Sequence, residues 1–315
     1  MKRHGNLFQK IISIENLRAA EKKARKGKAE QYGVTLFDKD PEAKLQEIHE
    51  RLKNKTYRTS AYKTFDIYEP KHRVIFALPY IDRIVHHAIM IPLERIFVAT
   101  FTADTYSCIK KRGIHGAAYA VRRALRDEKN TQYCLKLDIT KFYPSVDHDI
   151  LKQLVRKKIK DADLLWLLDE IIDSAPGLPI GNYLSQYLAN FYLSYFDHWL
   201  KEEKQVRYYF RYADDIVILF SNKSYLHALL ADMRNYLEQE LKLQVKENYQ
   251  VFPVYARGID FVGYRFYHTH VLVRKSIKQR FARMITSNKN RASIASYNGW
   301  FAHADCKNLV NKFSK

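Results

Sequence analysis

The chain of 315 residues is too long for a minimal module, and it can bury a sizeable core in one large domain or in two to three lobes. Lys and Arg total 54 against 34 Asp and Glu, and this formal charge of +20 predicts a polyanionic partner; the 14% of aromatic residues suits stacking on unpaired bases as well as filling of the core. Cys108, Cys134 and Cys306 show no CxxC spacing, which excludes a disulfide framework and a zinc site, and no apolar run approaches the roughly 20 residues of a membrane span. We therefore expect a soluble protein of a reducing compartment, without a signal peptide.

The first predicted segment is basic and helical, and it covers residues 1–60. Its charge is concentrated between Lys22 and Lys28, where a solvated helix face and contact with phosphates are both compatible with the pattern. Residues 57–80 contain two β-rich pieces on either side of the sequence EPKH, which predicts a hairpin.

The remaining elements alternate between helical and strand patterns. Residues 82–128 predict helices, with Pro92 and Gly113 marking kinks or breaks. There is no internal repeat and no low-complexity linker. In order, the rest of the chain predicts a strand at 133–143, a helical stretch at 147–174, a turn at 175–182, a helix at 183–203, a hairpin at 207–220, a helix at 225–241, β structure at 258–267, and a basic helical end.

Two adjacent carboxylates, Asp214 and Asp215, interrupt an apolar run in RYYFRYADDIVILF. A hairpin turn explains them in part, because Asp is a common turn residue. Asp138 lies in a second β-rich stretch, CLKLDITKFY. If the two strands are neighbours, three carboxylates converge and need a compensating cation. A pair of Mg²⁺ ions, or Mn²⁺, would satisfy them and would support phosphoryl transfer to a hydroxyl.

The order of three blocks carries a resemblance to a known family. LDITKFYPSVDH, GLPIGNYLSQYLANFYL and YADD follow one another, with FVGYRF further on. This order resembles the reverse transcriptase family. The resemblance implies an α+β, right-hand polymerase fold with fingers, a palm with an antiparallel sheet, and a short helical thumb. It divides the chain into a basic helical segment at 1–60, fingers at 61–132, a palm at 133–270 with fingers helices at about 149–178, and a thumb at 271–315.

The resemblance assigns the catalytic and metal-binding roles to the aspartates. Asp138, Asp214 and Asp215 match the metal ligands, with the carbonyl of Ile139 as an additional ligand. Tyr143 matches the bulky residue that blocks a ribose 2′-hydroxyl, although an ordinary core aromatic is an alternative.

Further residues match nucleotide-binding positions. Lys71 and Arg73 fall where the fingers reach the triphosphate, and a plain surface hairpin charge is the alternative. Gly181, with Ile180 and Gln186, matches the place where the backbone approaches the nucleotide. The alternative for Gly181 is a turn glycine that precedes a helix, and both interpretations are compatible. Lys246 is a candidate general acid for the departing pyrophosphate.

Nucleic-acid contacts are expected near the end of the chain. The segment from Phe261 to Tyr264 resembles the primer grip, although Phe261 and Val262 could equally be core residues. The primer-grip residues are Phe261, Val262, Gly263 and Tyr264. The cations expected to follow the backbone of an RNA/cDNA duplex are Arg274, Lys275, Lys278, Arg280 and Arg283.

The middle block departs from the commoner QG and SP pattern, because it reads Ile180-Gly181 and Ser185-Gln186. This form resembles reverse transcriptases of diversity-generating retroelements, which copy a template RNA with errors at adenines for targeted gene diversification. The resemblance implies dNTP substrates, a template RNA, a basic pentameric accessory protein, no membrane partner, and a bacterial or phage-encoded protein in the cytoplasm. A group II intron-like or defence-associated reverse transcriptase is the alternative, and a nucleic-acid-binding module with a degenerate palm is a more distant one.

Overall fold

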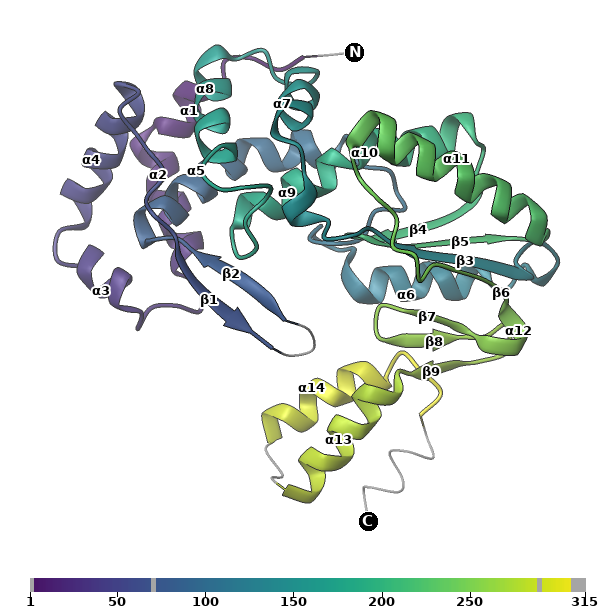
Figure 1. Cartoon of the computed structure of the whole chain (residues 1–315). Helices are drawn as coiled ribbons and strands as arrows, with labels where there is room; N and C mark the ends of the chain where they lie inside the picture. Colours follow the sequence, from purple (N-terminus) through teal and green to yellow (C-terminus); the bar gives the residue numbers. More distant parts are fainter. Residues whose placement is uncertain (1–2, 69–71, 288–290, 307–315) are drawn as a thin grey trace. The chain divides into compact units, whose positions relative to one another are not determined.

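This computed structural model describes residues 3–68, 72–287 and 291–306 as a mixture of helices and antiparallel sheets (Figure 1). The chain divides into two compact units. Residues 102–132 of the predicted fingers lie in the second unit, whereas residues 141–148 and 179–195 of the predicted palm lie in the first, together with the fingers helices predicted at about 149–178. The first unit comprises Met1–Phe101, Lys141–Tyr195 and Leu241–Leu243, and the second comprises Thr102–Thr140, Phe196–Glu240 and Gln244–Lys315.

The first unit is built mainly of helices, as the sequence predicted for its N-terminal part. Their starts are fixed by side chains that accept from free backbone N–H groups: Ser13 caps α2, and Asp40 caps α4 just before Pro41. Pro92 lies inside α5 and does not end it. The helices are α1 (Phe8–Ile12), α2 (Ile14–Arg25), α3 (Tyr32–Phe37), α4 (Pro41–Lys53), α5 (Tyr80–Val98), α7 (His148–Arg156), α8 (Ala162–Ile172) and α9 (Tyr183–Tyr192).

The stretch predicted as one helical region at 147–174 is two helices. Asp147 caps α7, and Asp161 caps α8 by accepting from the N–H of Leu164. Asp161 also accepts from the N–H groups of Leu7 and Phe8. A second N-cap in the middle of the stretch therefore explains the break.

The predicted hairpin is present in the first unit as β1 (Lys63–Ile67) and β2 (Arg73–Ala77). The strands pair antiparallel with Lys63 opposite Ala77 and Ile67 opposite Arg73. All of β1 is exposed. The N–H of Phe76 donates to the carbonyl of Ile180 at 2.8 Å, so β2 is tied to the turn that precedes α9.

The second unit contains a four-stranded antiparallel sheet in the order β4-β5-β3-β6. Figure 1 shows α6 on one face of this sheet and α11 on the other. Both faces are therefore covered, which explains why the central strands read as continuous apolar runs. The elements are β3 (Tyr133–Asp138), β4 (Tyr208–Tyr212), β5 (Asp215–Phe220), β6 (Gln250–Pro253), α6 (Gly113–Ala124) and α11 (Lys223–Leu241).

A small three-stranded sheet, β7-β8-β9, and two helices complete the second unit. Their apolar side chains continue the core that lies under α6, through Phe261, Tyr264, Phe281 and Phe301. The sequence predicted β structure at 258–267 and the helices, but not the β7–β8 hairpin as such, and neither β9 nor β6. The elements are β7 (Ile259–Phe261), β8 (Tyr264–Phe266), β9 (Val271–Val273), α13 (Lys275–Ser287) and α14 (Arg291–Phe301).

Short elements form the remaining connections. The single helix predicted at 183–203 is divided into α9, α10 (Ser194–His198) and the π-helical η3 (Trp199–Glu203). Within the described ranges, no helix combines the length and the hydrophobicity that a membrane span needs. The other short elements are η1 (Glu128–Asn130), η2 (Tyr143–Ser145) and α12 (Val254–Arg257).

Candidate active site

The three predicted aspartates meet at one end of the four-stranded sheet. Asp138, the last residue of β3, lies directly opposite Asp215, the first residue of β5. Asp215 is also paired with Tyr212, so that only Ala213 and Asp214 connect β4 to β5. The tight hairpin turn inferred from the sequence is therefore present, and it presents the carboxylates from a rigid apolar sheet.

The connection is strained at Ala213, whose φ of +55° is uncommon for a residue with a Cβ atom. Such a conformation costs about 1–2 kcal/mol and persists only where its surroundings hold it. The turn geometry is thus maintained by contacts outside the turn.

The electrostatics of Asp214 and Asp215 show an excess of negative charge. Burial and the neighbouring carboxylate of Asp138 raise the pKa of Asp214 to about 6. Burial likewise raises the pKa of Asp215 to about 6; Lys136 opposes this rise and Asp138 adds to it. Carboxylates with raised pKa values favour a compensating cation, because charge repulsion and desolvation both penalise their ionised forms.

Two lysines supply part of that compensation. The Nζ of Lys246 donates to Oδ1 of Asp138 at 2.7 Å, and its backbone N–H donates to the carbonyl of Asp138 at 2.9 Å. Lys246, predicted as a general acid, is therefore an ion-pair partner of a predicted metal ligand. The Nζ of Lys136 lies 3.5 Å from Oδ1 of Asp215 and also donates to the carbonyl of Asp260.

The carboxylate oxygens of the three aspartates suit a hard divalent cation, although the side chains are not arranged around one. In the described part of the chain, no three His, Cys, Asp or Glu side chains are grouped so as to hold a metal ion as they stand. Asp138, Asp214 and Asp215 nevertheless offer only carboxylate oxygens, the ligands that Mg²⁺ and Mn²⁺ prefer. A cation among them would replace the two lysine ammonium groups as counter-charge. Ile139 is fully buried and forms a bridge with Val245.

A cavity of about 270 Å³ adjoins Asp138 in the second unit. Lys136, Arg257 and Arg265 bring positive charge to its wall, and Asp138 and Asp260 bring negative charge. This mixture suits a ligand that carries both phosphates and a metal ion.

The predicted nucleotide-binding residues Gly181 and Gln186 line a separate cavity of about 640 Å³ in the first unit. Lys23, Lys28 and Arg83 make its wall basic. Burial lowers the pKa of Lys28, and Arg83 adds to the effect, as expected of cations gathered without an anion.

Gly181 is required by packing within the first unit. Its φ is +118°, and a Cβ at this position would lie 2.7 Å from the carbonyl oxygen of Phe76. The adjoining Ile180 is half-buried, and its carbonyl accepts from the N–H of Phe76. The glycine permits the backbone of this turn to approach β2.

The other predicted residues of the first unit differ in exposure. Tyr143 is half-buried at the start of η2, whereas its neighbour Phe142 is buried in the core. Arg73 is exposed at the start of β2. Lys71 lies outside the described residues.

The predicted primer grip forms the β7–β8 hairpin. Phe261 and Tyr264 are fully buried in the core, as the alternative for Phe261 allowed. Val262 and Gly263 both have positive φ, at +43° and +89°, and form the two-residue turn. A Cβ on Gly263 would clash with the ring of Trp300, so this turn packs against α14.

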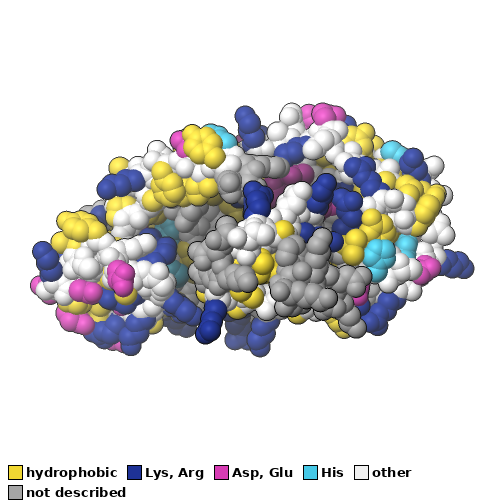
Figure 2. Space-filling model, turned by 90° about the horizontal axis from the view of Figure 1, so that it is seen from below, with side chains coloured by type: hydrophobic (Ala, Val, Ile, Leu, Met, Phe, Trp, Pro, Cys, Tyr) yellow, Lys and Arg dark blue, Asp and Glu magenta, His cyan; other side chains and the backbone are white. Residues whose placement is uncertain are grey.

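The predicted duplex-contacting cations are not equivalent. Arg274 is held by Asp260, with an Nε–Oδ1 distance of 2.7 Å. Lys275 and Arg280 are exposed on α13, and Lys278 is half-buried. Figure 2 shows Lys and Arg side chains over much of the face seen from below.

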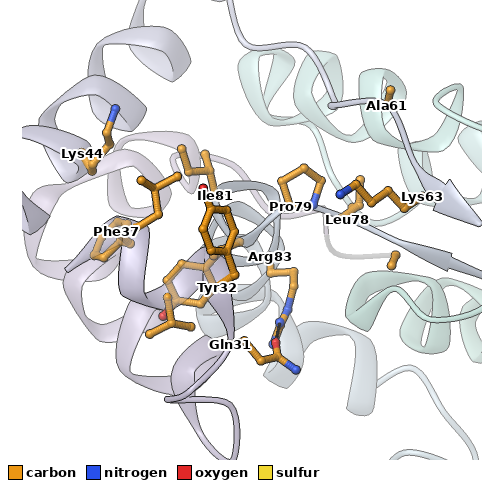
Figure 3. Close-up of a pocket in the computed structure, with 15 residues that line it drawn as sticks. Gln31, Tyr32, Phe37, Lys44, Ala61, Lys63, Leu78, Pro79, Ile81 and Arg83 are labelled. Carbon is orange, nitrogen blue, oxygen red and sulfur yellow. Dashed lines mark hydrogen bonds between the residues drawn. The ribbon is translucent and has the colours of Figure 1, made fainter. Parts of the chain in front are cut away.

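A further cavity in the first unit, of about 500 Å³, has a mainly apolar wall that includes Tyr32, Phe37 and Pro79 (Figure 3). Gln31 and Arg83 are joined by a hydrogen bond of 3.2 Å at its edge. Among the residues that the structure describes, no predicted site residue lines this cavity.

Lys136 and Asp260 are the neighbours of the aspartates that sequence reasoning missed. A signal for Lys136 exists: it precedes Asp138 by two residues in a strand, and such residues share a face of the sheet. Asp260 has no comparable signal, because it reaches Lys136 and Arg274 through tertiary packing.

Comparison with known proteins identifies relatives of this chain. Residues 63–266 match the family described as reverse transcriptase (RNA-dependent DNA polymerase). Protein YkfC of Escherichia coli is 26% identical over 65% of this chain and 64% of its own length. The group II intron-encoded protein LtrA of Lactococcus lactis is 25% identical over 52% of this chain and 29% of its own length, and the retron Ec73 reverse transcriptase of E. coli is 26% identical over 56% and 59%. The chain thus spans less than two thirds of these curated relatives.

A likeness in structure extends to telomerase from Candida tropicalis in complex with a fragment of telomeric RNA. The TM-score is 0.54 at 14% identity, over 78% of this chain and 52% of the telomerase chain. This likeness concerns the fold, and it confirms the expected α+β right-hand polymerase fold. The family match covers most of the chain and includes all three aspartates. The chain belongs to the reverse transcriptase family.

Proposed function

We propose that this protein is an RNA-directed DNA polymerase that transfers deoxynucleotides to a primer by two-metal catalysis. The observation that carries the proposal is the cross-strand pair of Asp138 and Asp215, with Asp214 beside it, inside the matched region. Members of the family generally use divalent metal ions. Here Asp138, Asp214 and Asp215, with the carbonyl of Ile139, would hold two Mg²⁺ or Mn²⁺ ions, which when bound would lower the pKa of the primer hydroxyl and neutralise the departing pyrophosphate.

Residues of this chain would balance the charge of the site before the reaction and would supply a proton at its end. Lys136 and Lys246 compensate the carboxylates before the metal is bound. Once released from Asp138, Lys246 is available to donate a proton to the pyrophosphate. Arg257 and Arg265, on the adjoining cavity, offer positive charge for phosphates.

We assign nucleotide and nucleic-acid contacts to residues of both units. In the first unit, Lys71 and Arg73 would bind the triphosphate, and Tyr143 would exclude a ribose 2′-hydroxyl. The basic cavity that Gly181 and Gln186 line suits the phosphates of a nucleic-acid strand. In the second unit, the turn at Val262 and the cations Lys275, Lys278 and Arg280 would contact the primer and the RNA/cDNA duplex; Arg274 contributes indirectly through Asp260.

We further propose that the protein makes error-prone cDNA for a diversity-generating retroelement, in a bacterial cytoplasm and with a basic pentameric accessory protein. The support is the block with Ile180-Gly181 and Ser185-Gln186. An apolar Ile180 in place of an amide offers no hydrogen bond from its side chain, so that base discrimination relies on shape.

A second candidate is a group II intron-like or defence-associated reverse transcriptase. Its support is the similarity to the intron-encoded protein LtrA and to the retron reverse transcriptase. Sequencing the RNA that co-purifies, together with its cDNA, separates the two: substitutions concentrated at adenines support the retroelement, and faithful or repetitive cDNA supports the second candidate.

Primer extension tests the polymerase itself. The wild-type protein should make DNA on an RNA template only with a divalent metal ion, and Asp214→Asn or Asp215→Asn should abolish synthesis while RNA binding persists. Synthesis by these variants at the wild-type rate would refute the metal-ligand assignment.

A further inference from the structure

A completely buried ion pair lies beneath the turn that carries Asp214 and Asp215. Arg211, on β4, and Asp197, on α10, both have side chains with no exposed surface. The guanidinium contacts the carboxylate through two parallel hydrogen bonds, Nε to Oδ1 at 2.7 Å and Nη2 to Oδ2 at 2.5 Å. This bidentate geometry fixes the plane and direction of the guanidinium.

The third nitrogen of the same guanidinium contacts the turn itself. Nη1 of Arg211 donates to the carbonyl oxygen of Ala213 at 3.0 Å. Ala213 is the residue with φ of +55° that immediately precedes Asp214. The peptide group between Ala213 and Asp214 is therefore hydrogen-bonded to a side chain that is itself anchored in the core.

Several further hydrogen bonds hold the Asp197–Arg211 pair in place. The hydroxyl of Tyr209 donates to Oδ1 of Asp197 at 2.6 Å, and that of Thr105 donates to Oδ2 at 3.0 Å. The backbone of Arg211 is bonded on both sides, to the carbonyl of Asp104 and the N–H of Tyr106, each at 3.0 Å. Neither member of the pair can move without breaking several hydrogen bonds.

Stability alone does not explain such a pair. Two buried charges lose their hydration, and apolar residues of similar volume often replace a buried ion pair without loss of stability. The contact that an apolar replacement cannot supply is the one to the carbonyl of Ala213. That contact maintains the strained turn, as described above.

We propose that Arg211 is a positioning residue for nucleotidyl transfer, which holds the peptide between Ala213 and Asp214 so that Asp214 and Asp215 are oriented to bind the metal ions. Asp197 serves to orient Arg211. The inference rests on the proposed function, because it takes the aspartates to be metal ligands.

Two variants of Arg211 and one matched control test the inference. Arg211→Met combined with Asp197→Asn removes both buried charges, and the amide introduced by the second change retains an oxygen for the Tyr209 hydroxyl. Arg211→Lys keeps the charge but has no planar fork to contact Asp197 and Ala213 together. Tyr57→Phe is the control, because it removes a buried hydrogen bond of 2.7 Å from a tyrosine hydroxyl to another carboxylate, that of Asp82, and leaves Asp197, Arg211 and the turn unchanged. If one Arg211 variant fails to fold, the other carries the test.

The measurements are Mn²⁺ affinity of the full-length protein without nucleic acid, by electron paramagnetic resonance titration, together with kcat, the KM for dNTP and the midpoint of thermal unfolding. Both Arg211 variants should bind Mn²⁺ about tenfold or more weakly and lose up to about 100-fold in kcat, with KM nearly unchanged, since a small misplacement of reacting groups has this effect. Tyr57→Phe should keep the wild-type affinity and kcat even where its unfolding midpoint falls as far.

Other outcomes would overturn the inference. Wild-type Mn²⁺ affinity and kcat in a folded Arg211 variant would refute it, and so would equal losses in Tyr57→Phe at equal stability. Asp215→Asn in the same assays separates this failure from that of the proposed function. If Asp215→Asn loses Mn²⁺ binding and the Arg211 variants do not, only the positioning role of Arg211 is wrong; if Asp215→Asn also behaves as wild type, the metal-ligand assignment itself is wrong.

Discussion

Asp138 and Asp215 face each other across β3 and β5, as the last pair of the strand register. Like charges that are directly opposite on adjacent strands destabilise a sheet. Burial adds to this effect, and the pKa of Asp215 is raised from 3.8 to about 6. The arrangement therefore costs stability in the protein without a cation at the aspartates, and a bound cation would recover it.

We predict that Asp215→Asn stabilises the metal-free protein near pH 7. The expected gain is about 1–3 kcal/mol in the free energy of unfolding, because each unit of pKa shift corresponds to about 1.4 kcal/mol and the half-exposed lysines already screen part of the charge. Denaturant unfolding in the presence of a chelator measures it. Asp232→Asn is the control, since Asp232 forms an exposed pair with Lys204 at 2.6 Å, and it should change stability by less than about 0.5 kcal/mol. A destabilised Asp215→Asn variant would contradict this prediction.

The aspartates could be predicted from the sequence because their signal is local. Asp138, Asp214 and Asp215 interrupt β-rich apolar runs, and such runs predict strands. Lys136 could have been added, because residues two apart in a strand lie on the same face. The contact between Lys136 and Asp215 depends on the register of β3 against β5. Placing Asp138 opposite Asp215, so that their carboxylates converge, would have suggested this register.

Other features depend on tertiary contacts that no local pattern records. Asp197 lies 14 residues before Arg211, on a helix whose spacing of apolar residues gives no reason to bury a carboxylate. Gly181 was predicted to approach a nucleotide, but the structure adds a close approach to the carbonyl of Phe76, more than 100 residues earlier. The strand β6 was missed because it has only four residues and its partner, β3, lies more than 100 residues earlier in the chain.

Gly181→Ala should destabilise the first unit and loosen the β1–β2 hairpin. The backbone at φ +118° disfavours any Cβ, and this Cβ would also displace the carbonyl of Phe76. We expect a loss of about 2–4 kcal/mol in the free energy of unfolding, together with faster hydrogen exchange at the amide of Phe76, which donates to Ile180.

Gly27→Ala is the matched control for this change. Gly27 has φ of +70°, but within the described residues no heavy atom beyond the glycine and its two chain neighbours lies within 4 Å of the position of its added Cβ. It should cost only about 1 kcal/mol, the contribution of the backbone conformation alone. Equal losses in the two variants would show that the contact with Phe76 is not important.

His86 should make the protein sensitive to acid. The side chain is buried in α5, and its Nε2 has no hydrogen-bond partner among the residues that the structure describes. Burial lowers the pKa of His86 from 6.5 to about 4, with Asp82 opposing the shift. Between these two values the unfolded chain binds a proton that the folded chain does not, so stability is lost as the pH falls from about 6.5 to about 4.

We expect His86→Leu to reduce this loss by about 2–3 kcal/mol at pH 4, since the titrating group is gone. Unfolding free energies measured from pH 7 to pH 4 provide the comparison with wild type. His227→Leu, at an exposed position of α11, should leave the dependence on pH as it is in wild type. A His86→Leu protein that loses stability as steeply as wild type would assign the acid sensitivity to other groups.

Ile180→Gln should make DNA synthesis more accurate opposite adenine in the template. The carbonyl of Ile180 is fixed by the N–H of Phe76, so the substitution changes the half-buried side chain without releasing the turn. An amide adds hydrogen-bonding capacity, and about 1.4 kcal/mol of additional discrimination lowers misincorporation about tenfold. The measurement is the error spectrum of sequenced cDNA made from a template rich in all four bases. Ile180→Leu, which stays apolar and has a similar volume, should keep the wild-type spectrum. If the glutamine variant errs at adenines as often as the leucine variant, hydrogen bonding by residue 180 does not set fidelity in this polymerase.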